Sequence, residues 1–231
     1  MNLELCTDCF EGALLAGRYR FKRIELCSAL SEGGLTPSFG MIKSCAEIGT
    51  VEVHAMIRSR GGSFTCNDME LLIMESDIQA ASQAGAKGVV FGILDADMKV
   101  SKKNQRLVDL ARSLGLQATF HRAFDQVDDP FEALDQLIQM GFDRVLTSGL
   151  KDKAIDGLEL IKAMQQKFGS KIEIMAGSGV NSGNALSLSN TGIDNLHFTA
   201  RRPSQEKIIP GMGFNMVTDE VKIRAISDLF A

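Results

Sequence analysis

Two short segments near the N-terminus repeat one pattern, in which a carboxylate and a thiol alternate with apolar side chains. Residues 3–6 read LELC and residues 24–27 read IELC. Thiolates are soft ligands that select Cu(I) or zinc, so Cys6 and Cys27 form a candidate metal site if their segments lie side by side. Cys9 completes one Cys-x-x-Cys, a weak signal because the chain holds no second copy. The alternative is that each thiol is a small buried apolar group.

Four other residues have side chains suited to moving a proton. A histidine or carboxyl group acts as a general acid or base when it reaches the reacting atom and its pKa lies near the working pH. The competing interpretation is structural, because charged groups inside a protein need partners merely to be stable. The candidate acid–base residues are Glu25, His121, Asp125 and His197.

Basic side chains and a glycine-rich turn form a candidate anion site. Residues 176–179 read AGSG, and backbone N–H groups in such a turn before a helix bind phosphate or carboxylate groups. The ligand would then be a small anionic metabolite. The alternative is that the glycines only form a tight turn. The candidate anion-binding residues are Arg58, Arg60, Arg122, Ser148, Gly177 and Gly179.

These residues are spread over a regular alternation of short apolar segments and longer amphipathic ones. The predicted strands are Leu3–Cys6, Arg23–Ser28, Val51–Arg58, Gly88–Leu94, Gln117–Ala123, Arg144–Ser148, Ile172–Gly177 and Asn195–Ala200. The clearest predicted helices are Asn67–Ala84, Ser101–Leu114, Pro130–Met140 and Lys151–Phe168. Strands that alternate with helices form parallel sheets. Eight such units favour an α/β fold of the (β/α)8 TIM-barrel type. The first strand is not followed by a Gly-x-Gly-x-x-Gly motif, and its absence disfavours a dinucleotide-binding fold.

The predicted barrel determines which way the polar side chains of the strands point. Side chains of a strand alternate between its two faces, so the apolar set faces the helices and the polar set faces the barrel interior. All three histidines, His54, His121 and His197, fall on the inward register. Active sites of such barrels gather at the carboxyl ends of the strands, where Cys6 and Cys27 lie. The glutamates earlier in the strands are expected to serve stability.

Length and composition narrow the class of protein. A chain of 231 residues fits one barrel domain over residues 1–231, with an irregular loop at about 203–217 before a C-terminal helix at 219–229. The net charge of -4 disfavours nucleic acid as a partner. Charges interrupt every apolar run before the ~20 residues that a membrane span needs, so no membrane partner is expected. The five cysteines are an odd number, which argues against a secreted disulfide scaffold and predicts a cytoplasmic protein.

Several longer motifs carry a resemblance to one family. The segments RIELCSALSEGGLTPSFG, MIRSRGG, GVVFGIL, TFHRAFD, LTSG and IMAGSGV occur in this order and together resemble the CutC-type copper homeostasis family. The resemblance runs from about Leu3 to Phe230 and implies a (β/α)8-type barrel and a cytoplasmic protein linked to copper handling. It also implies Cu(I) ligation by Cys6 and Cys27. Cys9 departs from the family pattern, in which a serine is more usual.

Three hypotheses of function follow from these observations. The first is a copper homeostasis protein that binds Cu(I) through strand-end cysteines at the barrel mouth. The second is a barrel enzyme, either an isomerase, a lyase or a hydrolase, acting on a small phosphorylated or carboxylated metabolite. The third is a binding protein or homo-oligomeric scaffold that does no chemistry.

Overall fold

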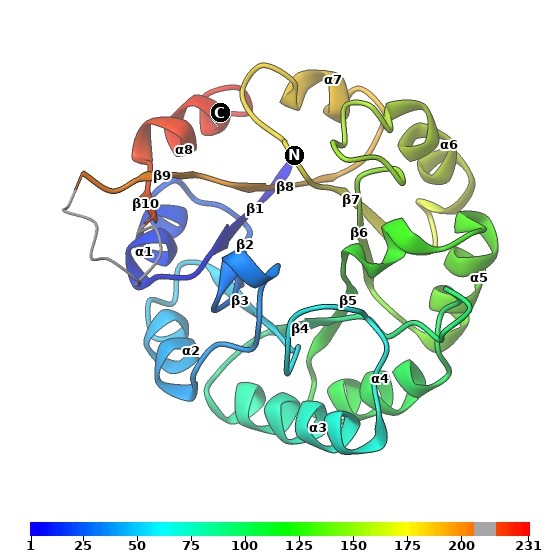
Figure 1. Cartoon of the computed structure of the whole chain (residues 1–231). Coiled ribbons are helices and arrows are strands. Elements are labelled where there is room, and N and C mark those ends of the chain that lie inside the picture. Colours follow the sequence, from blue (N-terminus) through cyan, green and yellow to red (C-terminus); the bar gives the residue numbers. More distant parts are fainter. Residues whose placement is uncertain (206–215) are drawn as a thin grey trace.

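A computed structural model describes residues 1–205 and 216–231, and its centre is a closed barrel of eight parallel strands (Figure 1). The strands follow one another around the barrel in chain order, and the eighth pairs with the first. Their bounds are β1 Asn2–Thr7, β2 Arg23–Leu26, β3 Glu52–Met56, β4 Gly88–Phe91, β5 Gln117–Phe120, β6 Arg144–Thr147, β7 Glu173–Ala176 and β8 Asn195–Thr199. The predicted (β/α)8 TIM-barrel fold is confirmed.

Helices surround the barrel on its outer side (Figure 1). In the picture α8 lies between α7 and α1, so it completes the outer ring next to the closure of the barrel. The helices are α1 Phe10–Arg18, α2 Phe39–Ala46, α3 Asp68–Gln83, α4 Lys103–Ser113, α5 Pro130–Met140, α6 Leu158–Phe168, α7 Ala185–Ser189 and α8 Glu220–Ser227. Two 3-10 turns, η1 at Leu30–Glu32 and η2 at Arg122–Gln126, follow β2 and β5.

The alternation of side chains along each strand divides the buried residues into two sets. On β2, Ile24 and Leu26 belong to the main apolar core that packs against the helices. Arg23 and Glu25 on the other face are equally buried, but they have charged partners inside the barrel. Many of the side chains inside the barrel are therefore polar or charged, as the sequence predicts, and the stability of the fold depends on their mutual pairing.

Most predicted strands are shorter in the structure, as with β4, which ends at Phe91 and not at Leu94, and β5, which ends at Phe120 and not at Ala123. Two boundaries bear on the site. Strand β2 ends at Leu26, so Cys27 lies just beyond it, where the chain turns into the loop of residues 27–38. Helix α6 begins at Leu158 and not at Lys151. The intervening turns bring Gly157 so close to the preceding loop that a Cβ there would lie 2.1 Å from the carbonyl oxygen of Ser148. A helix beginning at residue 151 would not form this contact.

The C-terminal part contains one further small sheet. Strand β9, Arg201–Pro203, pairs antiparallel with β10, Met216–Thr218. Both ends of the predicted loop at 203–217 belong to these strands, since Pro203 is in β9 and Met216 is in β10, and its residues 206–215 lie outside the described residues. The predicted final helix is present as α8, and the Asp219 carboxylate caps its first N–H groups. Within the described residues, no helix is both long and apolar enough to cross a membrane.

Candidate metal centre at the barrel mouth

The thiols of Cys6 and Cys27 lie together at the barrel mouth, the end of the barrel formed by the carboxyl ends of its strands. Cys6 is paired with Glu25 in the register of β1 and β2, and Cys27 follows two residues after Glu25. The two sulfur atoms and a Glu25 carboxylate oxygen all lie within 4.8 Å of one another. Both cysteines are almost completely buried, at 5% and 1% exposure. The two segments with the same pattern are therefore neighbours.

An apolar group of side chains encloses the two sulfur atoms. Met56 at the end of β3 and Val90 on β4 pack with both cysteines, and Leu30 of η1 packs against them. This group, which we call the thiol pocket, is separate from the main core between strands and helices. Leu30 belongs to the loop that follows β2, so the loop forms part of the cover of the pocket. The pocket therefore shields most of both cysteine side chains from solvent.

Charged groups approach the thiol pocket from below, inside the barrel. The Glu4 carboxylate accepts a hydrogen bond of 2.6 Å from Nε of Arg23, and its other oxygen lies 2.7 Å from Nδ1 of His197. Arg23 also donates to Oδ1 of Asn195 at 2.7 Å. The second ring nitrogen of His197 lies 3.8 Å from Glu25. These five residues, each nearly fully buried, connect β1, β2 and β8.

The charges of this network stabilise one another. Burial raises the pKa of the Glu4 carboxyl, but the Arg23 guanidinium and the His197 ring lower it further, so this pKa lies well below its usual range. Burial lowers the pKa of His197, yet Glu25, Cys6 and Glu4 raise it well above its usual value. Glu4 is therefore a carboxylate and His197 is an imidazolium at neutral pH.

The two thiols differ in acidity. The hydrogen bond from Cys27 and the charge of His197 outweigh burial and lower the pKa of Cys6 to about 5. Donating that hydrogen bond raises the pKa of Cys27 well above its usual value, and burial adds to this effect. Burial and the negative charge of Cys6 raise the pKa of Glu25, whose Oε1 atom is buried without a hydrogen-bond partner among the described residues. Cys6 is thus a thiolate at neutral pH, and a thiolate is the form that binds metals.

Cys9 lies apart from this pair. Its sulfur atom is 3.1 Å from Oγ1 of Thr218 on β10, and its backbone N–H donates to Thr7. Within the described part of the chain, two groups of side chains have ligand atoms close enough to hold one metal ion, namely Cys6 with Glu25 and Cys27, and Glu4 with Glu25 and His197. Cys9 belongs to neither group. Cys9 joins the start of α1 to the C-terminal sheet, and the candidate metal site has two thiols.

The predicted acid–base residue His121 lies on another side of the mouth, at the end of β5. Its Nδ1 atom accepts a hydrogen bond of 3.2 Å from the backbone N–H of Ala123, so the proton of the neutral ring is on Nε2. Burial and the nearby Arg58 lower the pKa of His121 to about 3. The ring packs against Phe64 with 4.9 Å between ring centres. At neutral pH the His121 ring is uncharged, with Nδ1 engaged by the backbone and Nε2–H as a hydrogen-bond donor.

Both carboxylate oxygens of Asp125, another predicted acid–base residue, accept hydrogen bonds from the surrounding loops. It accepts hydrogen bonds from Oγ1 of Thr147 at 2.6 Å and from the backbone N–H of Ser148 at 2.9 Å. It also accepts from Nε of Arg122 at 2.8 Å and from the N–H of Leu150 at 3.3 Å. These bonds connect η2 with the loop after β6. Asp125 therefore holds two loops together.

Each arginine predicted to bind an anion already has oxygen partners inside the protein. Arg58 donates to the carbonyl oxygens of Glu32 at 2.8 Å, Gly34 at 3.3 Å and Gly62 at 2.7 Å. It thereby fixes the loop that covers the thiol pocket. Arg122 donates to Ser148 at 3.1 Å in addition to its ion pair with Asp125.

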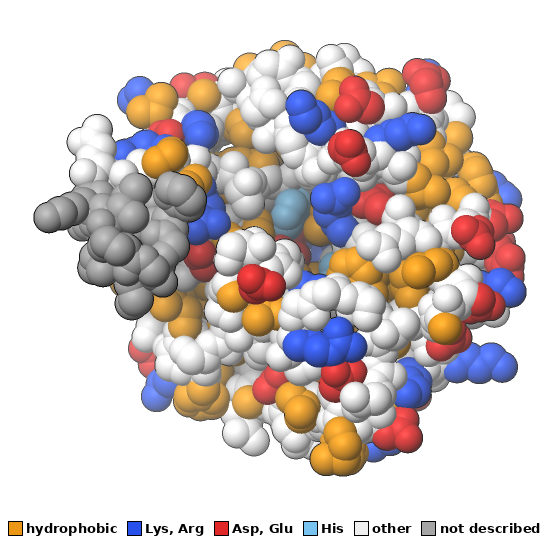
Figure 2. All heavy atoms as spheres, viewed as in Figure 1, with side chains coloured by type: hydrophobic (Ala, Val, Ile, Leu, Met, Phe, Trp, Pro, Cys, Tyr) orange, Lys and Arg blue, Asp and Glu red, His pale blue; other side chains and the backbone are white. Residues whose placement is uncertain are grey.

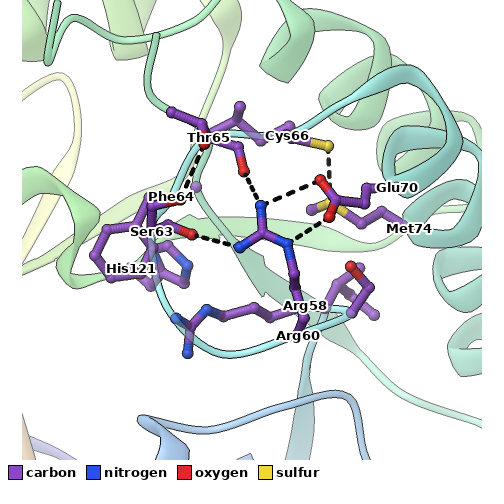
Figure 3. Close-up of a pocket in the computed structure, with 13 residues that line it drawn as sticks. Arg58, Arg60, Ser63, Phe64, Thr65, Cys66, Glu70, Met74 and His121 are labelled. Atoms are coloured by element: carbon purple, nitrogen blue, oxygen red, sulfur yellow. Dashed lines mark hydrogen bonds and ion pairs between the residues drawn. The ribbon is translucent and has the colours of Figure 1, made fainter. Parts of the chain in front are cut away.

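Arg60 lines a small open pocket, bordered also by His121 and Phe64 (Figure 3). Figure 3 shows its guanidinium directed at Glu70, with which it forms an ion pair, and at the loop of residues 63–65. Four of the six predicted anion-binding residues, Arg58, Arg60, Arg122 and Ser148, thus have structural partners.

The glycines after β7 have packing roles of their own. A Cβ on Gly177 would lie 2.6 Å from Cδ1 of Leu146 and 3.1 Å from Cδ2 of His197, so the missing side chain makes room for the histidine. Gly179 has a positive φ of +67° and packs over the side chain of Lys153.

Seen from outside, the mouth is a hollow at the centre of the molecule, in which histidine and Lys or Arg side chains are visible (Figure 2).

Comparison with known proteins assigns this fold and chain to a family. The model of the CutC family matches residues 1–202. The chain belongs to the CutC family. CutC of Vibrio vulnificus (strain YJ016) is 46% identical over 212 residues, which cover 90% of this chain and 85% of the relative. CutC of Histophilus somni (strain 2336) is 38% identical over 243 residues, which cover 100% of this chain and 99% of the relative.

A solved structure agrees with this assignment. CutC from Streptococcus agalactiae, a protein named for copper homeostasis, superposes with a TM-score of 0.81 at 33% identity. The match covers 86% of this chain and 98% of that one.

Three contributors to the mouth of this CutC protein were not among the residues predicted to form the site. Arg23 and Asn195 belong to the charged network, and Met56 belongs to the thiol pocket. The signal for Arg23 was its spacing of two residues from Glu25, which places both on the inner face of β2. Met56 lies two residues after His54 on β3 and therefore shares its inward direction.

Proposed function

We propose that this CutC protein binds Cu(I) at the barrel mouth through Cys6 and Cys27 and serves copper homeostasis in the cytoplasm. The observation that carries the proposal is the approach of two buried sulfur atoms from neighbouring strands to within 4.8 Å. Soft thiolates in an apolar pocket suit Cu(I) better than hard cations, which prefer oxygen ligands. All five cysteines are free thiols, which suits a reducing compartment.

The charges around the pocket suit the same ligand. Cu(I) bound by two thiolates leaves one net negative charge in a buried place, and an uncompensated buried charge is costly. His197 is an imidazolium near Cys6, so a positive charge is already present. Binding deprotonates Cys27, since a thiol must lose its proton to act as a ligand. In this role copper is a cargo, held by residues of this chain.

An anaerobic titration with Cu(I) against a competing chelator tests the proposal. We expect tight binding by the wild type and a loss of affinity well beyond about tenfold in Cys6→Ser/Cys27→Ser. The matched control is Cys45→Ser/Cys66→Ser, which removes two thiols elsewhere in the protein and should leave the affinity unchanged. Equal affinity of the wild type and Cys6→Ser/Cys27→Ser would exclude the proposed site.

The alternative of a barrel enzyme acting on a small anionic metabolite has weaker geometric support. Its three arginines are held by internal oxygen atoms. Nδ1 of His121, its proposed base, already accepts a hydrogen bond from the backbone N–H of Ala123, and the proton of the ring is on Nε2. A phosphate or carboxylate ion bound at the turn of residues 177–179 would be the observation that revives it.

A further inference from the structure

Met56 is a third sulfur-containing side chain in the thiol pocket. It lies on β3 and pairs with Val90 of β4, another member of the pocket. The register of β2 and β3 pairs Glu25 with His54 and Leu26 with Ala55. Continuing that register one step places Met56 beside Cys27. Met56 is 3% exposed, so its thioether lies within the protein and not at the surface.

The position of Gly34 shows that the two side chains converge. A Cβ on Gly34 would lie 3.1 Å from the sulfur atom of Cys27 and 3.6 Å from Cε of Met56. Both side chains therefore reach the same small region under the covering loop. Gly34 has a φ of +91°, a conformation that favours glycine, and its lack of a side chain leaves that region free.

The thioether of Met56, like that of the core residue Met164, has no hydrogen-bond partner among the described residues. The sulfur atom of Met175 accepts a hydrogen bond from Arg23 at 3.6 Å. The sulfur atom of Met74 lies 3.9 Å from Cys66, and that of Met41 lies 4.0 Å from Cys45. Met56 differs from Met164 in its position, because Met164 lies in the main core whereas Met56 packs in the cluster that holds two thiols.

We propose that Met56 is the third sulfur ligand of Cu(I) and that it favours Cu(I) over zinc. The inference rests on the proposed function of the thiol pocket. The thioether would donate a lone pair to the metal without losing a proton, and the copper stays Cu(I). A neutral ligand adds no charge to a buried site that already holds two thiolates. Thioethers are soft ligands that suit Cu(I), whereas zinc prefers thiolate, imidazole or carboxylate.

The test replaces the thioether by an apolar side chain of similar size. Met56→Leu keeps the pocket filled, since Leu and Met exchange at low cost in cores. Anaerobic titration with Cu(I) should show a loss of affinity of at least about tenfold, the lower limit for losing even an outer partner of a metal site. Zinc affinity should change less. The matched control is Met74→Leu, which removes the thioether next to Cys66 and should leave both affinities unchanged.

A spectroscopic measurement shows whether the sulfur itself binds. The protein labelled with 13C at its eleven methionine methyl groups is titrated with Cu(I), which is diamagnetic. One methyl signal, identified by its absence in Met56→Leu, should shift in proportion to bound metal. The methyl signal of Met74 should stay in place.

The outcomes separate the two proposals. Tight Cu(I) binding that depends on Cys6 and Cys27, together with an unshifted Met56 signal and full affinity in Met56→Leu, overturns the third ligand and leaves the thiol site intact. Wild-type protein that binds Cu(I) no better than Cys6→Ser/Cys27→Ser overturns both. A shifted signal with reduced affinity in Met56→Leu supports the third ligand.

Discussion

Nδ1 of His197 lies 2.7 Å from Oε1 of Glu4, and this contact joins the last strand of the barrel to the first. The same carboxylate accepts from Arg23, so a single buried glutamate holds two cations. Removing one member of a buried ion pair is far more damaging than removing an exposed one, because the other charge is left without compensation. Glu4 is therefore the residue on which the interior network depends.

Glu4→Gln should destabilise the protein strongly. The amide keeps the size of the side chain but leaves Arg23 without its negative partner and removes one of those of His197, at a cost of about 3 to 5 kcal/mol in the free energy of unfolding. Urea denaturation measures the difference. The control is Glu220→Gln, which breaks the exposed pair with Arg18 and should cost less than about 1 kcal/mol. Similar costs for both variants would show that the interior network does not depend on Glu4.

The three histidines should titrate away from their ordinary pKa, two below it and one above it. Burial lowers the pKa of His54, and burial together with Arg58 lowers that of His121 to about 3. His197 is shifted well upward by its carboxylate and thiol neighbours. Titration followed by the ring C–H signals in NMR should show one charged and two neutral rings at pH 7. A ring titrating near 6.5 would contradict this assignment.

The depressed pKa of His121 also links stability to pH. Below about pH 6.5 the unfolded chain binds a proton that the folded protein does not take up until about pH 3. Stability is therefore lost as pH falls through this window, by up to about 1.4 kcal/mol per pH unit. In His121→Gln the decline in the free energy of unfolding between pH 6.5 and 4.5 should be smaller by about 2 kcal/mol. Parallel curves for variant and wild type would be the contrary result.

Asp125→Asn should weaken the connection between η2 and the loop after β6. An amide replaces one acceptor oxygen by a donor, so it opposes the N–H groups of Ser148 and Leu150 and loses the charge that pairs with Arg122. We expect a loss of about 1 to 3 kcal/mol in the free energy of unfolding, measured with urea. Cu(I) affinity should be unchanged, because the thiols come from other strands. A variant as stable as the wild type would show that the carboxylate does not hold these loops.

Gly34→Ala should weaken copper binding more than its backbone strain explains. Gly34 and Gly115 both have positive φ, of +91° and +72°, so alanine at either position costs about 1 to 2 kcal/mol of stability. Only at Gly34 does the new methyl group meet Cys27 and Met56, while at Gly115 nothing lies within 4 Å. Gly34→Ala should therefore lower Cu(I) affinity, and Gly115→Ala should not. Equal affinities would show that the thiol pocket tolerates the extra atom.

The barrel and the inward direction of the two thiols were predictable from the sequence. In residues 3–6 and 24–27 the apolar residues occupy alternate positions, so the intervening Glu and Cys must share the opposite face. The closure of eight units then places both segments side by side. These features depend on periodicity and chain order, which the sequence displays directly.

The partners of the charged residues were not predictable in the same way. Arg58 and Asp125 have the residue types of ligand-binding groups and follow barrel strands, but they bind carbonyl oxygens and N–H groups of loops. Loop conformation decides those contacts, and no periodic pattern encodes it. Met56 was not among the predicted site residues, since a single methionine shows its neighbours only after the strand register is known.

Glu4 and His197 are 193 residues apart in the sequence, so their contact can form only late in synthesis. During synthesis the N-terminal segments leave the ribosome first, and both cysteines are present long before the eighth strand. Until then β1 has an unpaired edge, Glu4 lacks one of its two cations, and Cys6 lacks the imidazolium beside it. A nascent or truncated chain thus carries the thiols without the environment that tunes them, and only the finished polypeptide assembles the complete pocket.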